Sequence, residues 1–355
     1  MAWKKSAKLA VALAAVLSLA ACGSGASAGN GGDGGEKVTL TWANVGGQEA
    51  EREKFAFHDP FTDETGIKIE SVAFSNLIAQ LQKMVESGKP VWDVVHNVPY
   101  IALKYCGELL EKVDYSDFPD VFPENTTTEC TVPAGKFGFV YAYDNEVYTD
   151  EVPTELADFF DTETFPGKRV IRANNPRGYL EMALLADGVA PEDLYPLDIE
   201  RSLAKWDTIK SDLIFVPAVA AVQQALVSKQ ATMTMTISTN LGAAFDSGAT
   251  ISPVWDITFW DFDVFMIPKG TPYKEEAVAA IKFALQPERQ IENAELGGNT
   301  PVRTDIDPAT IDFEGGTEFN PFLGDDRGEL ILFDSEWWAE HLESASESWV
   351  AWQAG

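Results

Sequence analysis

The order of strand-like and helix-like patterns between residues 38 and 95 limits the fold more than any other feature of the sequence. Apolar or alternating stretches typical of strands occur at 38–43, 66–72 and 92–95, and helical spacing of apolar residues occurs at 48–61 and 76–86. A strand–helix–strand–helix–strand order favours parallel strands with helices packed on the faces of the sheet. The sequence therefore predicts an α/β fold.

The rest of the chain repeats this alternation. At about 100–200 residues per domain, 355 residues leave room for two or three domains. We expect two α/β lobes crossed by two strands. The later elements that the pattern predicts are strands at 137–143, 169–172, 231–237, 251–255 and 264–267, a helical turn at 155–160, and helices at 178–187, 199–210, 219–228, 274–284 and 290–296.

The ends of the first and third strands are the expected place for a ligand. In open parallel sheets, ligands bind outside the carboxyl ends of the strands, so residues 43–47 and 96–99 are predicted at a cleft. Gly46 and Gly47 allow two interpretations there. Their backbone N–H groups could face a ligand at the start of a helix, or the pair could form only a tight turn.

The N-terminus has the features of a bacterial lipoprotein leader. Three lysines precede a 13-residue apolar stretch at 9–21, which suits a signal peptide and is too short to span a bilayer. Small residues then lead into Cys22, as in a lipobox. We therefore expect a signal peptide at 1–21 that is removed before a lipidated Cys22.

Residues 22–36 are expected to tether the body of the protein to a membrane. Seven of the thirteen residues at 23–35 are glycine, and such a segment forms no core. Its root-mean-square reach is roughly 20 Å. Two acyl chains on Cys22 would suffice for stable anchoring, so the predicted location is extracytoplasmic, on the membrane.

The charge of the chain excludes some partners. It has 56 acidic and 26 basic side chains, with a formal net charge of −30. Nucleic acid is an unsuitable partner, because phosphate binding requires a basic surface. The acidity suits a cationic ligand, and it equally suits a protein that must stay soluble in salt.

Motifs for catalysis, cofactors and metals are missing from the sequence. It contains no Gly-x-Ser-x-Gly, no His-Glu-x-x-His and no phosphate-binding glycine loop, so we expect no enzyme and no cofactor. The three histidines lack the spacing of metal ligands, and no metal site is expected. Cys106 and Cys130 remain beside Cys22, and two cysteines in an exported chain favour a disulfide. A lipid-anchored hydrolase acting on a cell-surface polymer is the alternative function.

Residues 255–263 interleave aromatic and acidic side chains over nine positions. Such a segment could form an aromatic box with carboxylates, which holds an organic ammonium through cation–π contacts and charge-assisted hydrogen bonds. It could equally form half-buried strands whose aromatic rings pack in the core while the acids face water. The segment alone does not choose between the two.

A series of segments in a characteristic order resembles the extracellular solute-binding proteins of ABC importers, in the branch that binds spermidine and putrescine. The resemblance covers nearly the whole chain after the leader. It is carried by Gly46-Gly47, PFTDETGIKI at 60–69, WDVV at 92–95, FPGKR at 165–169, LEMALLADGVAP at 180–191, LYPLD at 194–198, DFD at 261–263, IPKG at 267–270, TP at 300–301, and WWAE at 337–340 with Trp349 and Trp352.

The resemblance implies a two-lobed type II periplasmic-binding-protein-like fold whose lobes are joined by two crossover strands. It assigns 37–141 and 264–355 to the first lobe and 142–263 to the second. It also implies that a monomer captures a small solute between its lobes by hinge closure and delivers it to a membrane permease and ATPase.

The polyamine site of that branch matches this sequence only in part. Asp263 occupies the position of an acid that precedes a crossover strand, while Asn97 replaces a serine or threonine and Ile237-Ser238 replaces a Trp-Asn pair. Where the branch has acids at the start of a second-lobe helix, this chain has Asn-Asn-Pro-Arg-Gly at 174–178. The expected ligand is therefore polyamine-like or another small polar or cationic compound. The candidate binding residues are Trp42, Asn44, Asn97, Tyr143, Asn175, Ser238, Trp260, Asp261 and Asp263.

Overall fold

A computed structural model describes residues 38–313, 317–324 and 326–355. The predicted signal peptide, Cys22 and the predicted tether at 22–36 lie outside the described residues. Among the helices of the described part, none is long and apolar enough to cross a membrane.

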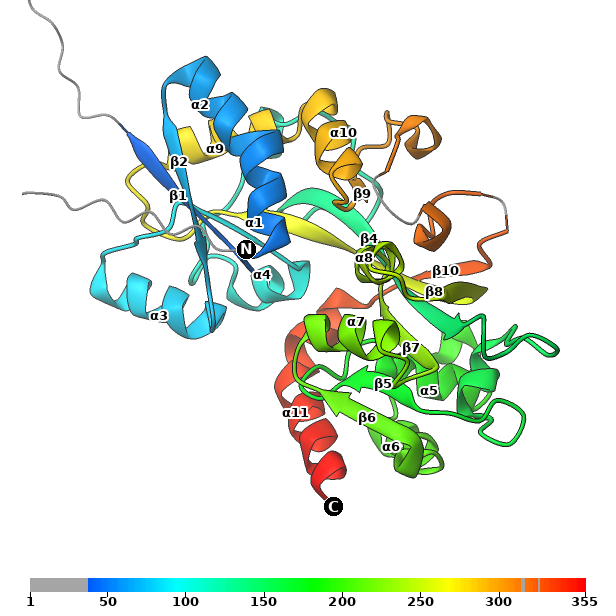
Figure 1. Cartoon of the computed structure of the whole chain (residues 1–355). Coiled ribbons are helices and arrows are strands. Elements are labelled where there is room, and N and C mark those ends of the chain that lie inside the picture. Colours follow the sequence, from blue (N-terminus) through cyan, green and yellow to red (C-terminus); the bar gives the residue numbers. More distant parts are fainter. Residues whose placement is uncertain (1–37, 314–316, 325) are drawn as a thin grey trace, which may run out of the picture. The chain divides into compact units, whose positions relative to one another are not determined.

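The strands form one mixed sheet of ten members (Figure 1). Eight of them follow the order β2-β1-β3-β8-β4-β7-β5-β6, while β10 pairs with β8 and β9 pairs with β4. Their bounds are β1 Thr39–Asn44, β2 Lys68–Ala73, β3 Val94–Asn97, β4 Val132–Asp144, β5 Arg169–Arg172, β6 Leu213–Val216, β7 Met233–Ile237, β8 Ile251–Met266, β9 Thr300–Pro301 and β10 Glu329–Leu332.

Helices of the α, π and 3-10 types connect these strands. The α-helices are α1 Gln48–Glu53, α2 Asp59–Thr65, α3 Leu77–Ser87, α4 Pro99–Tyr105, α5 Tyr179–Ala186, α6 Ile199–Asp207, α7 Val219–Val227, α8 Ser238–Asp246, α9 Lys274–Ala284, α10 Pro287–Glu295 and α11 Ser335–Ala354. The shorter helices are η1 Lys54–His58 (a π-helix), η2 Tyr115–Asp117, η3 Leu156–Phe160, η4 Pro191–Asp193, η5 Lys210–Asp212, η6 Pro308–Thr310 and η7 Thr317–Phe319.

The first strands pair as their order in the sequence predicts. Strand β1 runs parallel to both β2 and β3, and α3 connects β2 to β3. Helix α3 begins where the Asn76 side chain accepts a hydrogen bond from the Ala79 N–H, and it ends at Gly88 in the left-handed conformation. In the second half, β5 is parallel to β6 and β7. The predicted α/β class is confirmed.

Two long antiparallel strands, β4 and β8, run through the middle of the sheet. The carboxyl end of β8 pairs with β3, and its middle pairs with β10. The far half of β4 pairs with β7. These strands connect the two halves of the sheet, as the two predicted crossover strands should. The separate strands predicted at 251–255 and 264–267 are one continuous strand, because residues 259–263 pair with β4 and residues 257–260 pair with β10.

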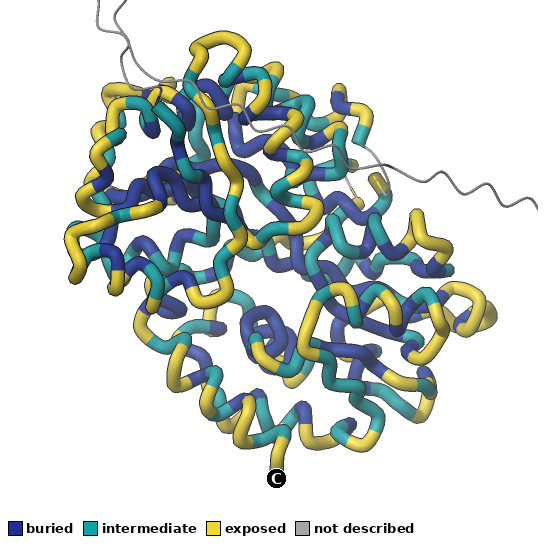
Figure 2. Tube along the Cα trace, turned by 60° about the vertical axis from the view of Figure 1, so that its left-hand side comes forward, coloured by how far each residue is buried: buried dark blue, intermediate teal, exposed yellow. Residues whose placement is uncertain are grey.

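Buried side chains form separate apolar cores on the two halves of the sheet, and Figure 2 shows the buried positions in the interior and the exposed ones at the periphery. Phe61 and Phe265 belong to a core built from early strands and α9, whereas Tyr179 and Trp206 belong to a core of the other half. The aromatic side chains of α11, including Trp349, pack into the second of these cores. The domain limits given above stay a prediction.

A disulfide joins Cys106 and Cys130, with an S–S distance of 2.05 Å and a Cα–Cα distance of 5.5 Å. It links the end of α4 to the residues just before β4. Cys130 is fully buried.

Candidate functional site

A cavity of about 1070 Å³ lies where segments from both halves of the sheet meet. The start of α1 and the end of β3 contribute from one half, and the end of β5 and the junction of β7 with α8 contribute from the other. The lining residues fall in the segments 45–55, 96–100, 137–139, 172–177, 218–223, 236–247, 263, 296–300, 313, 317–320 and 333.

The cavity lies at the predicted strand ends. Val45, Gly46 and Gly47 line it after β1, and residues 96–98 line it after β3. Both glycines have positive φ angles, 79° and 62°. A Cβ at position 46 would lie 2.9 Å from the Cβ of Ala73, so this turn requires glycine at that place.

Four of the candidate binding residues line the cavity. They are Asn97, Asn175, Ser238 and Asp263. The side chains of Asn97 and Asn175 also accept hydrogen bonds from nearby backbone N–H groups of Val98 and Arg177. Whether these residues contact a solute stays a prediction.

Trp42 and Asn44 do not line the cavity, in contrast to the expectation from the sequence. Both are fully buried at the end of β1. The Trp42 ring packs against Phe265 in the core, with ring centroids 5.0 Å apart. The Asn44 side chain donates to Glu53 at 2.6 Å and accepts from the Gly46 N–H at 2.9 Å, so it shapes the turn behind the cavity wall.

Tyr143, Trp260 and Asp261 are also absent from the cavity lining. Tyr143 lies near the far end of β4, where its ring packs against Tyr148. Trp260 packs against Phe322, with ring centroids 5.9 Å apart. The interleaved segment 255–263 therefore forms no aromatic box, because Asp263 alone among its residues lines the cavity.

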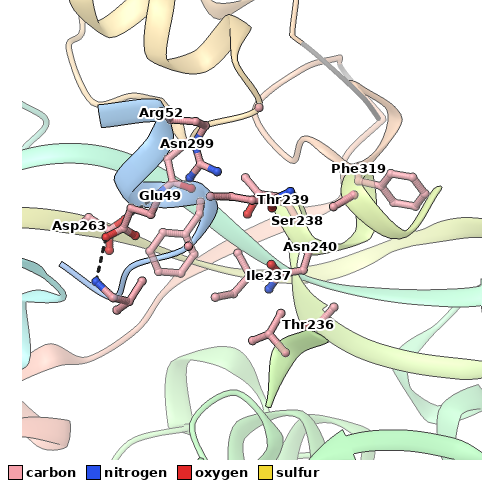
Figure 3. Close-up of a pocket in the computed structure, with 18 of the residues that line it drawn as sticks. Glu49, Arg52, Thr236, Ile237, Ser238, Thr239, Asn240, Asp263, Asn299 and Phe319 are labelled. Carbon is pink, nitrogen blue, oxygen red and sulfur yellow. Dashed lines mark hydrogen bonds between the residues drawn. The ribbon is translucent and has the colours of Figure 1, made fainter. Parts of the chain in front are cut away.

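One wall of the cavity carries an acidic cluster, which we define as Glu49, Glu53, His96 and Asp263. The His96 Nδ1 atom lies 2.5 Å from Glu53 Oε1 and 3.6 Å from Glu49 Oε1, and His96 Nε2 lies 3.8 Å from Asp263 Oδ2. Figure 3 shows Glu49 and Asp263 side by side, with Glu49 accepting a hydrogen bond from the Val45 N–H at 3.3 Å. Because Glu49 comes from α1 and His96 from β3, the helix after β1 brings the cluster together.

Burial and mutual charge shift the pKa values of this cluster. Burial opposes the charged imidazole of His96, but the surrounding carboxylates, Glu53 foremost, outweigh it and raise the pKa of His96 to about 10. Burial and neighbouring carboxylates raise the pKa of Glu49 to about 7, against the opposing effect of His96. Burial likewise raises the pKa of Asp263 to about 6.

Arg52 and Asn299 lie beside the acidic cluster (Figure 3). The Asn299 side-chain amide donates a hydrogen bond to Asp263. Burial lowers the pKa of Arg52, while the carboxylates of the cluster act in the opposite direction. The Nε of Arg52 is buried and has no hydrogen-bond partner among the described residues.

A second charged group, the arginine cluster, consists of Arg172, Arg177 and Asp261. Arg177 forms a buried ion pair with Asp261, and its guanidinium lies 4.2 Å from the ring centroid of Phe333 and 5.2 Å from that of Tyr100. Both arginines line the cavity, and the Nε atoms of both are buried without a partner in the described part of the chain. Two guanidinium groups therefore lie in the cavity wall.

Neutral polar groups complete the lining. The residues Thr236–Asn240 lie across from Glu49 and Asp263, with Phe319 beyond them (Figure 3). Ser238 accepts a hydrogen bond from the Gly138 N–H at 3.3 Å, so its hydroxyl is held at the junction of β7 and α8.

Sequence reasoning missed most of the charged lining. The sequence marks position 177 only as a place without the expected acid, and it predicts His96 at the cleft without giving it a role in binding. The signal for Glu49 is positional, as it is for His96: Glu49 lies at the start of the helix that follows the first strand, and His96 follows the neighbouring third strand. Both positions face the predicted ligand edge of the sheet.

Comparisons with known proteins agree with this architecture. Residues 56–318 match the family model of the bacterial extracellular solute-binding proteins. A gamma-aminobutyric acid-binding protein of Pseudomonas aeruginosa is 31% identical over 330 residues, which cover 90% of this chain and 92% of the relative.

Solved structures show the same two-lobed fold. The Atu4243-GABA receptor superposes with a TM-score of 0.79 at 31% identity, over 89% of this chain and 97% of the receptor. The binding protein AgtB of A. tumefaciens R10, in complex with agropinic acid, has a TM-score of 0.75 at 28% identity, over 90% and 99% of the two chains. The spermidine/putrescine-binding protein PotD of Streptococcus pneumoniae is 19% identical and shares the fold, with a TM-score of 0.65 over 89% and 99%.

The expected two-lobed fold and the expected family are therefore confirmed. Solute-binding proteins of ABC importers bind small solutes outside the cytoplasm and work with a permease and an ATPase. This chain belongs to the bacterial extracellular solute-binding protein family.

Proposed function

We propose that this protein captures a small zwitterion, a compound with an ammonium group at one end and a carboxylate at the other, and presents it to an ABC importer. The observation that carries the proposal is the presence of two oppositely charged clusters in the lining of one cavity. Supporting it, two relatives that are 31% identical are named for gamma-aminobutyric acid.

The acidic cluster would bind the ammonium group. Its three carboxylates outnumber its one imidazolium, and the nearby Arg52 still leaves one negative charge when all these groups are ionised. Glu49 and Asp263 line the cavity, so their oxygens can accept hydrogen bonds from a bound ammonium.

The arginine cluster would bind the carboxylate group. Asp261 offsets one of its two guanidinium charges, which leaves one positive charge facing the cavity. The planar guanidinium of arginine suits bidentate binding of a carboxylate. A zwitterion thus offsets both excess charges, whereas a polyamine would place an ammonium beside the arginines.

The positions of the charged groups also explain why a bound ligand would favour closure of the two lobes. Glu49, Glu53 and His96 belong to elements of one half of the sheet, Arg172 and Arg177 belong to the other half, and Asp263 lies on the connecting strand β8. A ligand that contacts both clusters binds more tightly when the two lobes are closed. Its binding therefore shifts the population of the protein toward the closed conformation. We further propose that a monomer, anchored through a lipidated Cys22, then docks on the permease.

Four compounds with the same four-carbon chain test this proposal by thermal unfolding. Gamma-aminobutyrate carries both charges, butyrate only the carboxylate, butylamine only the ammonium, and putrescine two ammonium groups. Gamma-aminobutyrate should stabilise the protein by about 2.7 kcal/mol at a concentration of 100 Kd, with much smaller effects for the other three.

The number of carbon atoms between the ammonium and the carboxylate of the ligand must be varied before a negative result is accepted. The same assay should cover amino acids from glycine to 6-aminohexanoate, because the cavity could prefer another separation of the two charges. A larger stabilisation by putrescine than by every amino acid would overturn the zwitterion in favour of a polyamine. Failure of all amino acids would overturn it outright.

A further inference from the structure

Three side chains of the acidic cluster form a potential metal centre. One ligand atom from each of Glu49, Glu53 and His96 can be chosen so that all three lie within 4.8 Å of one another. An imidazole nitrogen combined with two carboxylates is a ligand set that Zn²⁺ and other first-row divalent ions accept.

The distances are close to those of a metal site. Ligand atoms about 2.0–2.2 Å from a tetrahedral ion lie roughly 3.3–3.6 Å apart. The separation of His96 Nδ1 from Glu49 Oε1 is 3.6 Å. Glu53 Oε1 lies nearer to His96 Nδ1, at 2.5 Å, so the Glu53 carboxylate would move back by about 1 Å to admit an ion.

Buried polar atoms without hydrogen bonds are an independent indication of a ligand. The residue Glu53 is 1% exposed, and His96 is 9% exposed. Glu53 Oε1 and both ring nitrogens of His96 lack a hydrogen-bond partner among the described residues, despite the short distance between them. His96 Nδ1 and Glu53 Oε1 are close enough to attract each other as ions, but a divalent ion bound between them in place of the imidazolium proton would satisfy both atoms with direct bonds.

The surrounding residues orient these ligands. Asn44 donates to Glu53 Oε2 at 2.6 Å, which leaves Oε1 to face the histidine. Asp263 Oδ2 lies 3.8 Å from His96 Nε2, on the side where a carboxylate commonly accepts a hydrogen bond from a metal-binding histidine, although this distance is too long for one. Asn44 therefore acts as a positioning residue.

We propose that Glu49, Glu53 and His96 bind a divalent first-row transition ion, for which Zn²⁺ is the probe. Glu49 lines the cavity and is half-buried, so the ion enters from the cavity and keeps one coordination position open toward it. The ion cancels the negative charge that would otherwise attract an ammonium. Ion and amine therefore compete, and only this competition rests on the proposed function.

Titration calorimetry of the full chain without a histidine tag tests the site. Zn²⁺ should bind at one site and Mg²⁺ much more weakly. His96→Gln and Glu53→Gln should each weaken Zn²⁺ binding by at least about 10–100-fold. The matched controls are His341→Gln, which changes a histidine stacked on Trp337 in α11, and Glu64→Gln, which changes an exposed acid of α2. Both controls should bind Zn²⁺ like the unchanged protein.

The following results would overturn the metal site. They are no saturable Zn²⁺ binding, equal binding by the His96→Gln variant with its circular dichroism unchanged, or loss of binding in a control. Co²⁺ provides a second readout that does not depend on the variants: its absorption spectrum should show nitrogen and oxygen ligands, and a thiolate charge-transfer band would instead place the ion on Cys22.

Competition separates the two proposals. Saturating Zn²⁺ should weaken gamma-aminobutyrate binding at least tenfold, and the His96→Gln variant should not show this effect. Amine binding without Zn²⁺ binding would contradict the metal site and leave the proposed function standing. Zn²⁺ binding without binding of any amino acid would contradict the proposed function and leave the metal site standing.

Discussion

Single charged side chains decide what this cavity can bind, and their partners determine how much charge remains. Asp261 is fully buried and paired with Arg177, so it cannot serve as the anchor for a cation that the sequence suggested. Asp263 is two residues further along β8 and lines the cavity. Because side chains alternate along a strand, Asp261 and Asp263 lie on the same side of the ladder. The two differ because Asp261 forms an ion pair with Arg177.

Asp263→Asn should weaken the binding of amine-bearing ligands by about 10–100-fold. A hydrogen bond to a charged group contributes about 1.5–3 kcal/mol, and the asparagine removes the charge while keeping the size. Titration calorimetry with the best amino acid from the series measures the change. Glu329→Gln, at an exposed acid of β10, is the matched control. Unchanged affinity in the Asp263→Asn variant would exclude this carboxylate as an ammonium ligand.

Amine binding should weaken as the pH falls from 8 to 5. The pKa of Glu49 is raised to about 7 and that of Asp263 to about 6, so both carboxylates gain protons in this interval and lose the charge that attracts an ammonium. His96, with its pKa raised to about 10, stays protonated throughout. A dissociation constant measured at each pH should rise toward acid, and the Asp263→Asn variant should lack the lower of the two steps. A flat profile would contradict the role of both acids.

At the scale of elements, the alternation of strands and helices was predictable, and the interruptions were not. Apolar periodicity located β1, β5 and α9 to within a residue or two. It read 48–61 as one helix, whereas the structure has α1 and α2 separated by the π-helix η1. The π-helix η1 buries Phe57 and His58, and the spacing of apolar residues at 48–61 does not distinguish it from a continuous α-helix.

The charged residues of the cavity were less predictable than the strands and helices, because they depend on tertiary contacts. Its residues come from β1–α1, β3, β8 and the turn before α5, which are far apart in the chain. Single-sequence patterns indicate which strand ends share an edge. They do not indicate which side chains neutralise one another there, since that depends on three-dimensional contacts such as the pair of Arg177 with Asp261.

Helix α11 packs against the segment of the chain that carries the arginine cluster. Trp349 is fully buried, stacks parallel to Tyr179 with ring centroids 5.8 Å apart, and donates to the Arg172 carbonyl at 3.3 Å. Gln353 donates to the carbonyl of Ala173 at 2.6 Å. The last helix therefore holds the end of β5, from which Arg172 reaches the cavity.

Trp349→Ala should lower the free energy of unfolding by about 3–5 kcal/mol, because it leaves a large cavity in a packed aromatic core. Urea denaturation provides the measurement. The matched control is Val350→Ala, one residue further along α11, where the side chain is 53% exposed and the expected change is within about 0.5 kcal/mol. Equal effects of the two substitutions would show that α11 does not pack as described.

For the whole molecule, the excess of acidic side chains mainly determines the charge of the protein surface. The net charge is −30, yet the cavity uses only a few carboxylates, and some of these are offset by histidine or arginine. Most of the charge therefore concerns self-repulsion and solubility.

The melting temperature should rise when sodium chloride is increased from 0.1 M to 1 M. The Debye length falls from about 10 Å to about 3 Å over this range, which screens repulsion among the surface acids. Screening also weakens the exposed ion pairs, such as Lys112 with Glu129, but such pairs contribute little. A thermal scan checks the direction, with potassium chloride as a control for ion identity. A fall in melting temperature would mean that paired charges dominate.

The uninterrupted sheet has a consequence for heat denaturation. Because β4 and β8 hydrogen-bond to each other and to strands on both sides, melting either half would expose the other's edge strands and apolar contacts. The two lobes should therefore melt together. Differential scanning calorimetry should show one peak whose calorimetric and van't Hoff enthalpies agree, and a bound ligand should shift that peak without splitting it.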